Sequence, residues 1–303
     1  MLDWIKGKFL QKYGLEPHFL LQKTWFENDS TITEKHALGK HGWFKPKSDE
    51  IDSAHSFLDY NGKVWGVSVP GFRDAFTEEG CGEDCREVTR REGQSLVNSL
   101  DKAAQNNATM VLLEGWTDMA ESAGFYRSNK WEYPNQYINL VRKYSDPEPE
   151  TLRFQAEAAD AFYDVTVKNQ GRQYANRSID VGEMPDKSGW YVGYTSVSEW
   201  LEYQNVELSC GRYRFTAKVA TRATGKKLRL DFGDDLNLLP TVDVPFTGGL
   251  EFYQLVHLGQ LKLRGGSYNL RLVFESTGGL NVDWFFAKRV SDCYCELDEQ
   301  ALI

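Results

Sequence analysis

The sequence predicts two domains of different fold class, an α/β domain followed by an all-β sandwich. The 303 residues suffice for two ordinary hydrophobic cores. Apolar runs alternate with helix-like stretches before residue 146, whereas short period-two runs fill the chain after residue 153. The formal charge of −9, from 35 basic and 44 acidic residues, lacks the basic excess typical of nucleic-acid-binding proteins. No apolar run approaches the roughly 18 residues of a membrane span, and the first residues lack the pattern of a secretory signal.

The first domain is expected to be built from parallel βα units. Asp3 as N-cap and Gly14 as stop bound a helix with Ile5 and Phe9 on one face. Nearly continuous apolar runs of strand length are typical of strands buried on both faces of a parallel sheet. The predicted strands are 17–21, 42–44, 64–69 and 110–113, and the other predicted helices are 86–106 and 135–144.

The second domain shows alternating strands bounded by Gly, Asn and Asp, which is typical of an antiparallel sandwich. Its clearest strands are 200–203, 211–219, 228–232 and 267–274. Pro147 and Pro149 mark the boundary between the domains. We therefore assign 1–146 to the first domain, 147–153 to a linker, 154–290 to the sandwich and 291–303 to a C-terminal tail.

The five cysteines do not form paired CxxC motifs, which argues against a structural zinc site. Cys81 and Cys85 lie four apart beside a helical stretch, where a disulfide is within reach. Two free buried thiols are the alternative for this pair.

Residues 154–290 resemble a family 6 carbohydrate-binding module. Four landmarks in order carry the resemblance: Phe154-Gln155-Ala156-Glu157-Ala158; Gly193-Tyr194 followed by Glu199-Trp200-Leu201-Glu202-Tyr203; Thr247-Gly248-Gly249; and Asn281-Val282-Asp283-Trp284. The resemblance implies a jelly-roll-like sandwich that binds a plant-type polysaccharide, such as β-glucan or xylan, in a cleft between loops.

The same resemblance implies the sugar-binding residues. Tyr194 and Asn281 fall on the positions of a stacking ring and of an amide that hydrogen-bonds sugar hydroxyls. Leu250 stands where the family usually supplies a Trp, so we add Trp190 and Tyr253 as candidate rings. Binding on the concave sheet face is one alternative, and a sandwich whose aromatic residues are all core is another.

A structural calcium ion is expected to tie the first strand of the sandwich to the last. Gln155 and Glu157 are two apart and would share one face of a strand, and Asp283 comes from the terminal strand. Three oxygen ligands suit a hard cation that accepts further backbone carbonyls. Ordinary solvated side chains are the alternative.

The segment Glu114-Gly115-Trp116-Thr117-Asp118, together with Pro70-Gly71-Phe72 after the preceding strand, resembles the last βα units of glycoside-hydrolase barrels related to families 71 and 99. About 150 residues leave room for about four βα units, whereas a full (β/α)8 barrel takes about 250 residues. The resemblance therefore implies a half TIM-type barrel.

Glycoside hydrolysis needs two carboxyl groups at the C-terminal ends of barrel strands. Glu34 and Glu114 form the expected pair, with Asp118 beside them. Glu34 could equally lie in a polar loop, and Glu114 could hydrogen-bond a neighbouring strand. The resemblance also implies that an essential acid on an early strand is missing here, in which case the domain would bind a glycan without cutting it. Either way, we expect an extracellular carbohydrate-active protein.

A half barrel would expose an apolar inner face and two unpaired strand edges. A second copy of the chain could cover them by completing an eight-stranded barrel with two-fold symmetry. We therefore expect a homodimer, and packing of the sandwich against the open side is the alternative.

Overall fold

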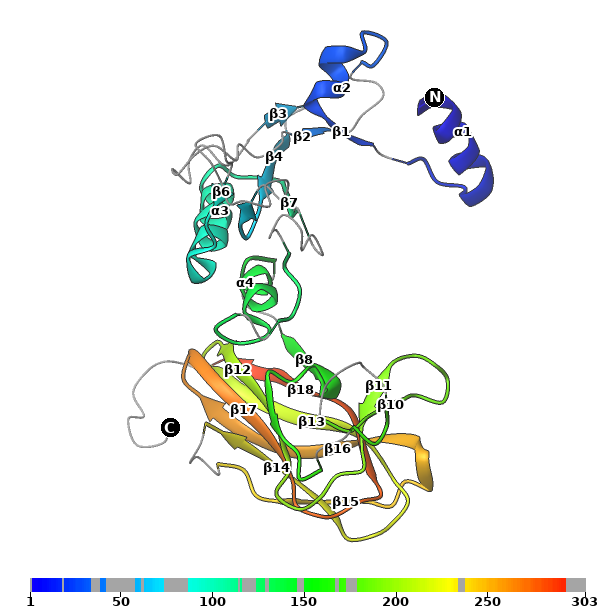
Figure 1. Ribbon diagram of the computed structural model, residues 1–303, viewed down its shortest axis with the longest axis vertical. Helices are drawn as coiled ribbons and strands as arrows, with labels where there is room; N and C mark the ends of the chain where they lie inside the picture. Colours follow the sequence, from blue (N-terminus) through cyan, green and yellow to red (C-terminus); the bar gives the residue numbers. More distant parts are fainter. Residues whose placement is uncertain are drawn as a thin grey trace, which may run out of the picture. The chain divides into compact units, whose positions relative to one another are not determined.

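The computed structural model describes most of the chain as two compact units, residues Met1–Tyr144 and Ser145–Ile303 (Figure 1). The described ranges are 2–17, 19–33, 39–41, 58–60, 63–73, 87–113, 115, 124–128, 131–145, 150–166, 169–172, 179–233 and 238–292.

The first unit contains short sheets and four α-helices among its described residues. Strand β1 (Leu20–Gln22) pairs in parallel with β2 (Gly39–His41), and β4 (Lys63–Ser68) pairs in parallel with β7 (Met110–Leu113). The chain between β4 and β7 includes α3 (Gln94–Gln105), so these elements form one of the expected βα units. The remaining elements are α1 (Leu2–Tyr13), α2 (Lys23–Asn28), β3 (Leu58–Tyr60), β5 (Phe72–Arg73), β6 (Glu87–Val88), η3 (Arg91–Gly93) and α4 (Gln136–Ser145).

The described strands do not form the four-stranded parallel sheet of the expected half barrel. The two parallel pairs belong to separate sheets, and β3 joins β4 in antiparallel orientation. Tyr60 pairs with Lys63, and the two intervening residues read Asn-Gly, the pair that favours tight hairpins. An apolar run shows that a strand is buried, but it does not show the direction of its partner. The predicted strand 42–44 lies outside the described residues.

Two small hydrophobic clusters hold the described parts of this unit. One joins Val67, Val69 and Phe72. The other packs α3 against α4 through Leu96, Leu100, Phe125 and Tyr137. This second cluster confirms apolar helix faces within the predicted ranges 86–106 and 135–144. The first helix begins only at Gln94, because Glu87 and Val88 form strand β6 and pair with β5 instead.

The second unit is a sandwich of two sheets, as predicted. The six-stranded sheet has the order β10-β11-β18-β13-β16, with β8 also paired to β18, and the five-stranded sheet has the order β15-β14-β17-β12-β9. The six-stranded sheet contains β8 (Thr151–Gln155), β10 (Val181–Glu183), β11 (Trp190–Val192), β13 (Gly211–Thr221), β16 (Gly249–Leu263) and β18 (Leu280–Asp292). The other contains β9 (Ala161–Tyr163), β12 (Trp200–Leu208), β14 (Lys226–Phe232), β15 (Val242–Val244) and β17 (Gly266–Phe274).

The alternating pattern of the strands builds a single core between these sheets. Phe215 and Phe285 of one sheet and Phe232 of the other are each at most 1% exposed. The first strand already begins at Thr151, within the residues 147–153 that the sequence assigns to a linker, because β8 pairs with the last strand, β18. The outward-facing residues of the two sheets form the two outer faces of the sandwich.

Candidate functional site

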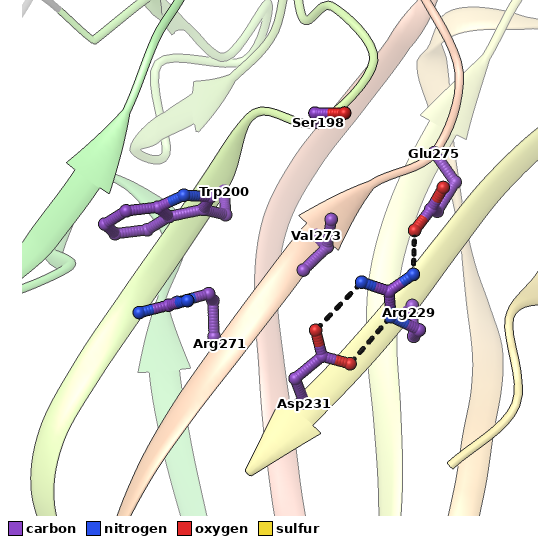
Figure 2. A pocket seen from close by; sticks show the side chains of 7 residues that line it. All are labelled: Ser198, Trp200, Arg229, Asp231, Arg271, Val273 and Glu275. Atoms are coloured by element: carbon purple, nitrogen blue, oxygen red, sulfur yellow. Dashed lines mark hydrogen bonds and ion pairs between the residues drawn. The ribbon is translucent and has the colours of Figure 1, made fainter. Parts of the chain in front are cut away.

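An open hollow of about 440 Å³ lies on the outer face of the five-stranded sheet (Figure 2). Three adjacent strands supply its wall: Trp200 comes from β12, Arg271 from β17 and Arg229 from β14. Successive strand residues point to opposite faces, so the residues between these positions, such as Leu201 and Leu272, fill the core instead. The complete lining is Ser198, Trp200, Arg229, Asp231, Arg271, Val273 and Glu275.

The charges in the hollow are paired with one another. Arg229 makes a bidentate contact with Asp231, with Nε to Oδ1 at 2.7 Å and Nη2 to Oδ2 at 3.0 Å, and its Nη1 also contacts Glu275. Arg271 donates from Nε and Nη2 to one oxygen of Glu202, at 2.9 and 2.6 Å. The hydrogen bond with Asp231 is the main cause that raises the pKa of Arg229. Such bidentate pairs fix the side chains in place before any ligand arrives.

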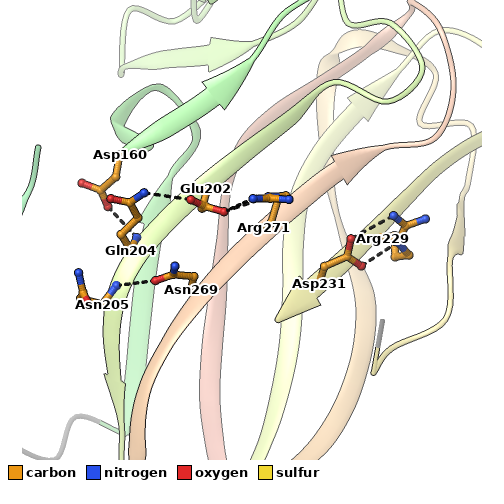
Figure 3. A network of polar contacts seen from close by, with 8 residues as sticks. All are labelled: Asp160, Glu202, Gln204, Asn205, Arg229, Asp231, Asn269 and Arg271. Carbon is orange, nitrogen blue, oxygen red and sulfur yellow. Dashed lines mark hydrogen bonds and ion pairs between the residues drawn. The ribbon is translucent and has the colours of Figure 1, made fainter. Parts of the chain in front are cut away.

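The polar network continues along the sheet towards β9 (Figure 3). Gln204 donates from Nε2 to Glu202 at 3.0 Å, and its backbone N–H donates to Asp160 at 3.0 Å. The backbone N–H of Asn205 donates to Asn269 on β17 at 3.0 Å. The outer face therefore presents an ordered array of hydrogen-bonding groups.

Aromatic rings lie beside this array. The rings of Trp200 and Tyr163 have centroids 6.5 Å apart and are inclined by 28°. Arg271 lies over the Trp200 ring at 4.3 Å, and Tyr163 is 50% exposed. The half-buried Trp200 and the exposed Tyr163, next to paired charges, match what a sugar ring needs, which is an apolar surface for its C–H face and partners for its hydroxyls.

A second site lies where β11 and β18 meet the first residues of β16. We call Tyr191, Tyr194, Tyr253 and Asn281 the loop-end cluster. Burial raises the pKa of Tyr253 above its usual range, while the neighbouring Asn281 amide acts in the opposite direction. Burial also raises the pKa of Tyr191, and the adjacent Tyr194 hydroxyl adds to this effect. Three of the four sugar-binding residues predicted from the sequence therefore lie together.

Local backbone features position this cluster. Tyr194 has a φ of 57°, which is uncommon for a bulky residue, and its ring is 48% exposed. A Cβ at Gly193 would lie only 2.4 Å from Oδ1 of Asn281, so glycine is needed for this close approach. Asn281 itself is buried and donates to the carbonyl of Leu250 at 3.3 Å.

The remaining predicted ring, Trp190, lies on a different face of its strand. Val192 faces the core, and Tyr191 belongs to the loop-end cluster, so alternation directs Trp190 away from Tyr191. Phe252 is 55% exposed and lies beside Gly248, where an added Cβ would be 3.5 Å from its ring. Phe252 is thus a further exposed ring, two residues after Leu250.

The residues predicted to bind calcium have different surroundings. Glu157 and Asp283 are 7% and 6% exposed, and they lie close enough for Asp283 to affect Glu157. Burial, and to a smaller degree the charge of Asp283, raises the pKa of Glu157 to about 7. Gln155 is exposed, because it occupies an outward position of β8 next to the buried Phe154. Glu157 is buried, and it lies in the 3-10 turn η4 (Ala156–Ala158) rather than on the strand.

Two buried carboxyl groups side by side fit a hard cation. Asp283 already contacts an ammonium, since Nζ of Lys218 lies 2.7 Å from its Oδ2. No group of three or more His, Cys, Asp or Glu residues in the described ranges is arranged to hold a metal ion. Glu157 and Asp283 would therefore need backbone or water oxygens to complete a calcium site.

The predicted catalytic residues Glu34, Glu114 and Asp118 lie outside the described residues, as do Cys81 and Cys85. Asp29, directly after α2, accepts hydrogen bonds from the backbone N–H and the hydroxyl of Thr31 at 2.9 and 2.6 Å. Among the described helices, none is long and apolar enough to cross a membrane.

Sequence reasoning missed most of the hollow on the five-stranded sheet. Its arginines and carboxylates occupy the outward positions of alternating strands, where polar residues are expected in any sandwich. Only the pairing of β12, β14 and β17 brings them together. The available signal was the Trp at position 200 among outward-facing charges.

Comparison with known proteins gives two family matches. Residues 175–287 match the carbohydrate-binding module of family 35. Residues 1–161 match the family described as a domain of unknown function, DUF5010. The comparisons thus support a carbohydrate-binding module in the C-terminal half, whereas the resemblance of the first half to glycoside-hydrolase barrels is without support from them.

Several curated proteins are similar over part of the chain. The clotting factor G alpha subunit of Tachypleus tridentatus is 26% identical over 163 residues, which are 50% of this chain and 22% of that protein. Beta-agarase AgaA of Microbulbifer thermotolerans is 32% identical over 119 residues, 38% of this chain and 27% of the enzyme. Endo-1,4-beta-xylanase A of Thermoclostridium stercorarium is 29% identical over 160 residues, 52% of this chain and 30% of the enzyme. The chain spans less than a third of the length of these relatives.

Solved structures of family 6 and family 35 modules are also similar. A β-1,3-glucan-binding family 6 module from Bacillus halodurans is 27% identical, with a TM-score of 0.38 over 46% of this chain and 98% of the module. A family 35 module from Clostridium thermocellum is 21% identical, with a TM-score of 0.35 over 46% of this chain and 98% of the module. Residues 175–287 match a carbohydrate-binding module, and because the match over residues 1–161 covers more than half of its length, the chain belongs to the DUF5010 family.

Proposed function

We propose that this chain binds a neutral polysaccharide of the β-glucan or xylan type on the outer face of its five-stranded sheet. The observation that carries the proposal is the hollow in which Trp200 lies beside two arginines whose charges are already paired. Sugar hydroxyls can bond to such fixed groups without separating the charges. The glucan and xylan relatives named above support the choice of polymers.

The loop-end cluster is the second candidate site for the same function. Its exposed Tyr194 ring and buried Asn281 amide match the two contacts that the sequence predicts for a sugar. The two sites lie on different sheets, because Asn281 belongs to β18 and Trp200 to β12. A substitution at one site therefore leaves the other site unaltered, so the two sites can be tested separately.

Affinity electrophoresis tests both sites in gels that contain laminarin, barley β-glucan or xylan. We expect Trp200→Ala to lose most of the retardation, since removal of a stacking ring costs about 1–3 kcal/mol of binding energy. Trp200→Phe keeps a ring and should retain part of it. Trp25→Ala, which removes an exposed Trp from the first unit, is the matched control.

Retardation that survives in Trp200→Ala but disappears in Tyr194→Ala would move the site to the loop-end cluster. Retardation that survives in both variants would refute the two assignments. Lack of retardation of the unaltered chain on all three polymers would refute the proposed ligand class.

A calcium ion bound by Glu157 and Asp283 is part of the proposal. Its charge would offset the burial of the two carboxyl groups and would join the first turn of the sandwich to the last strand. Calcium should raise the melting temperature of chelator-treated protein, because a ligand that binds only the native state stabilises it. Asp283→Ala should abolish that response.

For the first unit, we retain glycoside hydrolysis by Glu34, Glu114 and Asp118 as the proposal to test. Release of reducing sugar from the same three polymers, lost in Glu114→Gln, would support it. The expected homodimer is tested by light scattering, where a mass near 35 kDa, the mass of one chain, would refute it. Extracellular location follows from the polymeric ligand and belongs to this proposal.

A further inference from the structure

The outer face of the six-stranded sheet carries basic side chains that neither sugar site uses. On β13, Tyr213 and Phe215 are buried in the core, and Arg212 and Arg214 alternate with them on the exposed face. The adjacent strands place further cations on this face. We call Arg153, Arg212, Arg214, Lys262 and Lys288 the basic face.

The register of the sheet brings these cations next to one another. Lys262 of β16 lies directly opposite Arg212, and Lys288 of β18 lies directly opposite Arg214. Directly opposite residues have Cβ atoms about 4.5–5.5 Å apart, so two cations can reach one anion. Arg153 of β8 lies opposite Phe286, on the far side of β18 from β13.

Few carboxylates neutralise this face. Lys288 contacts Glu150 at 2.9 Å. Within the part of the chain that the structure describes, no carboxylate pairs with Arg212, Arg214 or Lys262. Like charges directly opposite one another are unfavourable in a sheet. In a chain with a net charge of −9, this concentration of positive charge points to an anionic partner.

We propose that the basic face binds a sulfated polysaccharide. A sulfate ester has three terminal oxygens and can accept hydrogen bonds from both members of an opposite pair, such as Arg212 and Lys262. A carboxylate has only two oxygens, and a single guanidinium fork can occupy both. The half-buried ring of Phe286 offers an apolar surface to a sugar on the same face of β18. Its neighbour Trp284, 5.6 Å away, already holds the guanidinium of Arg153 over its ring at 4.5 Å.

The test compares dextran sulfate with unsulfated dextran, polygalacturonate and single-stranded DNA, with the full chain as the binding protein. We expect dextran sulfate to bind most tightly and its affinity to fall with salt. The triple variant Arg212→Gln, Arg214→Gln, Lys262→Gln should weaken it about tenfold or more, because three counter-charges are removed. The matched control Arg172→Gln, Lys187→Gln, Lys227→Gln removes three exposed positive charges elsewhere and should bind normally.

A separate variant distinguishes a loss of binding from a loss of folding. Arg214→Glu places an acid opposite Lys288, so the sheet should stay intact while binding weakens. Equal loss in the matched control, or equal binding of polygalacturonate or DNA, would overturn the assignment to sulfated sugar. Failure of dextran sulfate to bind better than dextran would overturn it as well. Retardation on laminarin and xylan should stay unchanged in the triple variant, which separates this inference from the function proposed for the other sheet.

Discussion

Gly193 is the residue on which the geometry of the loop-end cluster depends most directly. Its missing side chain leaves room for Oδ1 of Asn281, which a Cβ would approach to 2.4 Å. We expect Gly193→Ala to displace Asn281 and to weaken sugar binding at this site by about 1–2 kcal/mol, the usual scale of such single-site damage. Affinity electrophoresis on the best-bound polymer measures the effect.

Gly189→Ala provides the matched comparison, because an added Cβ there meets no atom within 4 Å. Gly189 directly precedes β11, and Gly193 directly follows it. If the two variants bind equally well, the approach of Asn281 does not matter for the ligand.

Glu157 gives the sandwich a pH dependence. Its pKa of about 7 in the folded state exceeds the usual 4.5, so between these values the native state binds more protons than the unfolded chain. The free energy of unfolding should therefore fall as the pH rises from about 4.5 to 7, by on the order of 2–3 kcal/mol. In chelator, urea titrations at pH 5 and pH 8 measure this loss, which Glu157→Gln should largely remove.

Glu207→Gln, an exposed position on β12, should leave the pH dependence unchanged. Calcium added at pH 8 should restore the stability of the unaltered chain, since a cation beside Glu157 favours its ionised form. A metal-free protein equally stable at both pH values would contradict the proposed cause.

Some of these residues could be predicted from the sequence and others could not. The resemblance located Tyr194 and Asn281 by their positions in its motifs, and both lie in the loop-end cluster beside Tyr253, which the sequence analysis added as a candidate ring. Gln155 and Glu157 do not share a face, since the chain leaves the strand between them. The end of a strand depends on the partner strand, which the local sequence does not contain.

In the strand pair of β13 and β16, two positively charged side chains, Arg212 and Lys262, lie directly opposite each other. Lys262→Glu would place a carboxylate opposite Arg212 and should stabilise the sandwich by about 0.2–1 kcal/mol. That corresponds to a rise of about 1–3 °C in the melting temperature, measured by calorimetry at low salt.

A substitution on β14 that creates a like-charge pair with β15 is the comparison, and it should change the melting temperature in the opposite direction. Lys227 lies opposite Asp243, with the charged groups 3.9 Å apart, so Lys227→Glu should lower the melting temperature. High salt should shrink both differences. If the melting temperature changes in the same direction in both variants, cross-strand charge does not determine their stability.

Whole strands were predicted more reliably than their partners. Period-two patterns located β13, β14 and β17 within a few residues, because one face of each strand fills the core. Direction and neighbour depend on contacts between distant segments, so the antiparallel pairing of β3 with β4 was missed. For the same reason the hollow lined by Trp200, Arg229 and Arg271 could not be assembled from the sequence alone.

At the scale of the whole molecule, each hydrophobic core draws its residues from one unit. The large core runs from Leu152 to Ala287, and the smaller clusters lie between Val67 and Tyr137. We expect two calorimetric transitions, because separate cores unfold as separate cooperative units. Calcium and sugar should shift only the transition of the sandwich.

Phe215→Ala in the sandwich and Leu96→Ala in the first unit assign the two transitions. Each removes a fully buried side chain and should cost about 2–5 kcal/mol in its own unit. A single transition that both variants lower equally would show that the units unfold together.

The pairing of β8 with β18 affects how easily a sandwich of this kind can be inserted into, or fused to, another protein during evolution. Thr151, where the chain enters the sandwich, lies directly opposite Lys288 on the strand by which it leaves. Entry and exit therefore lie side by side on neighbouring strands. A domain of this kind can be spliced into a single exposed loop of a host without forcing the two halves of that host apart. Gene duplication and fusion can thus append or insert it as a cassette with little cost to either partner.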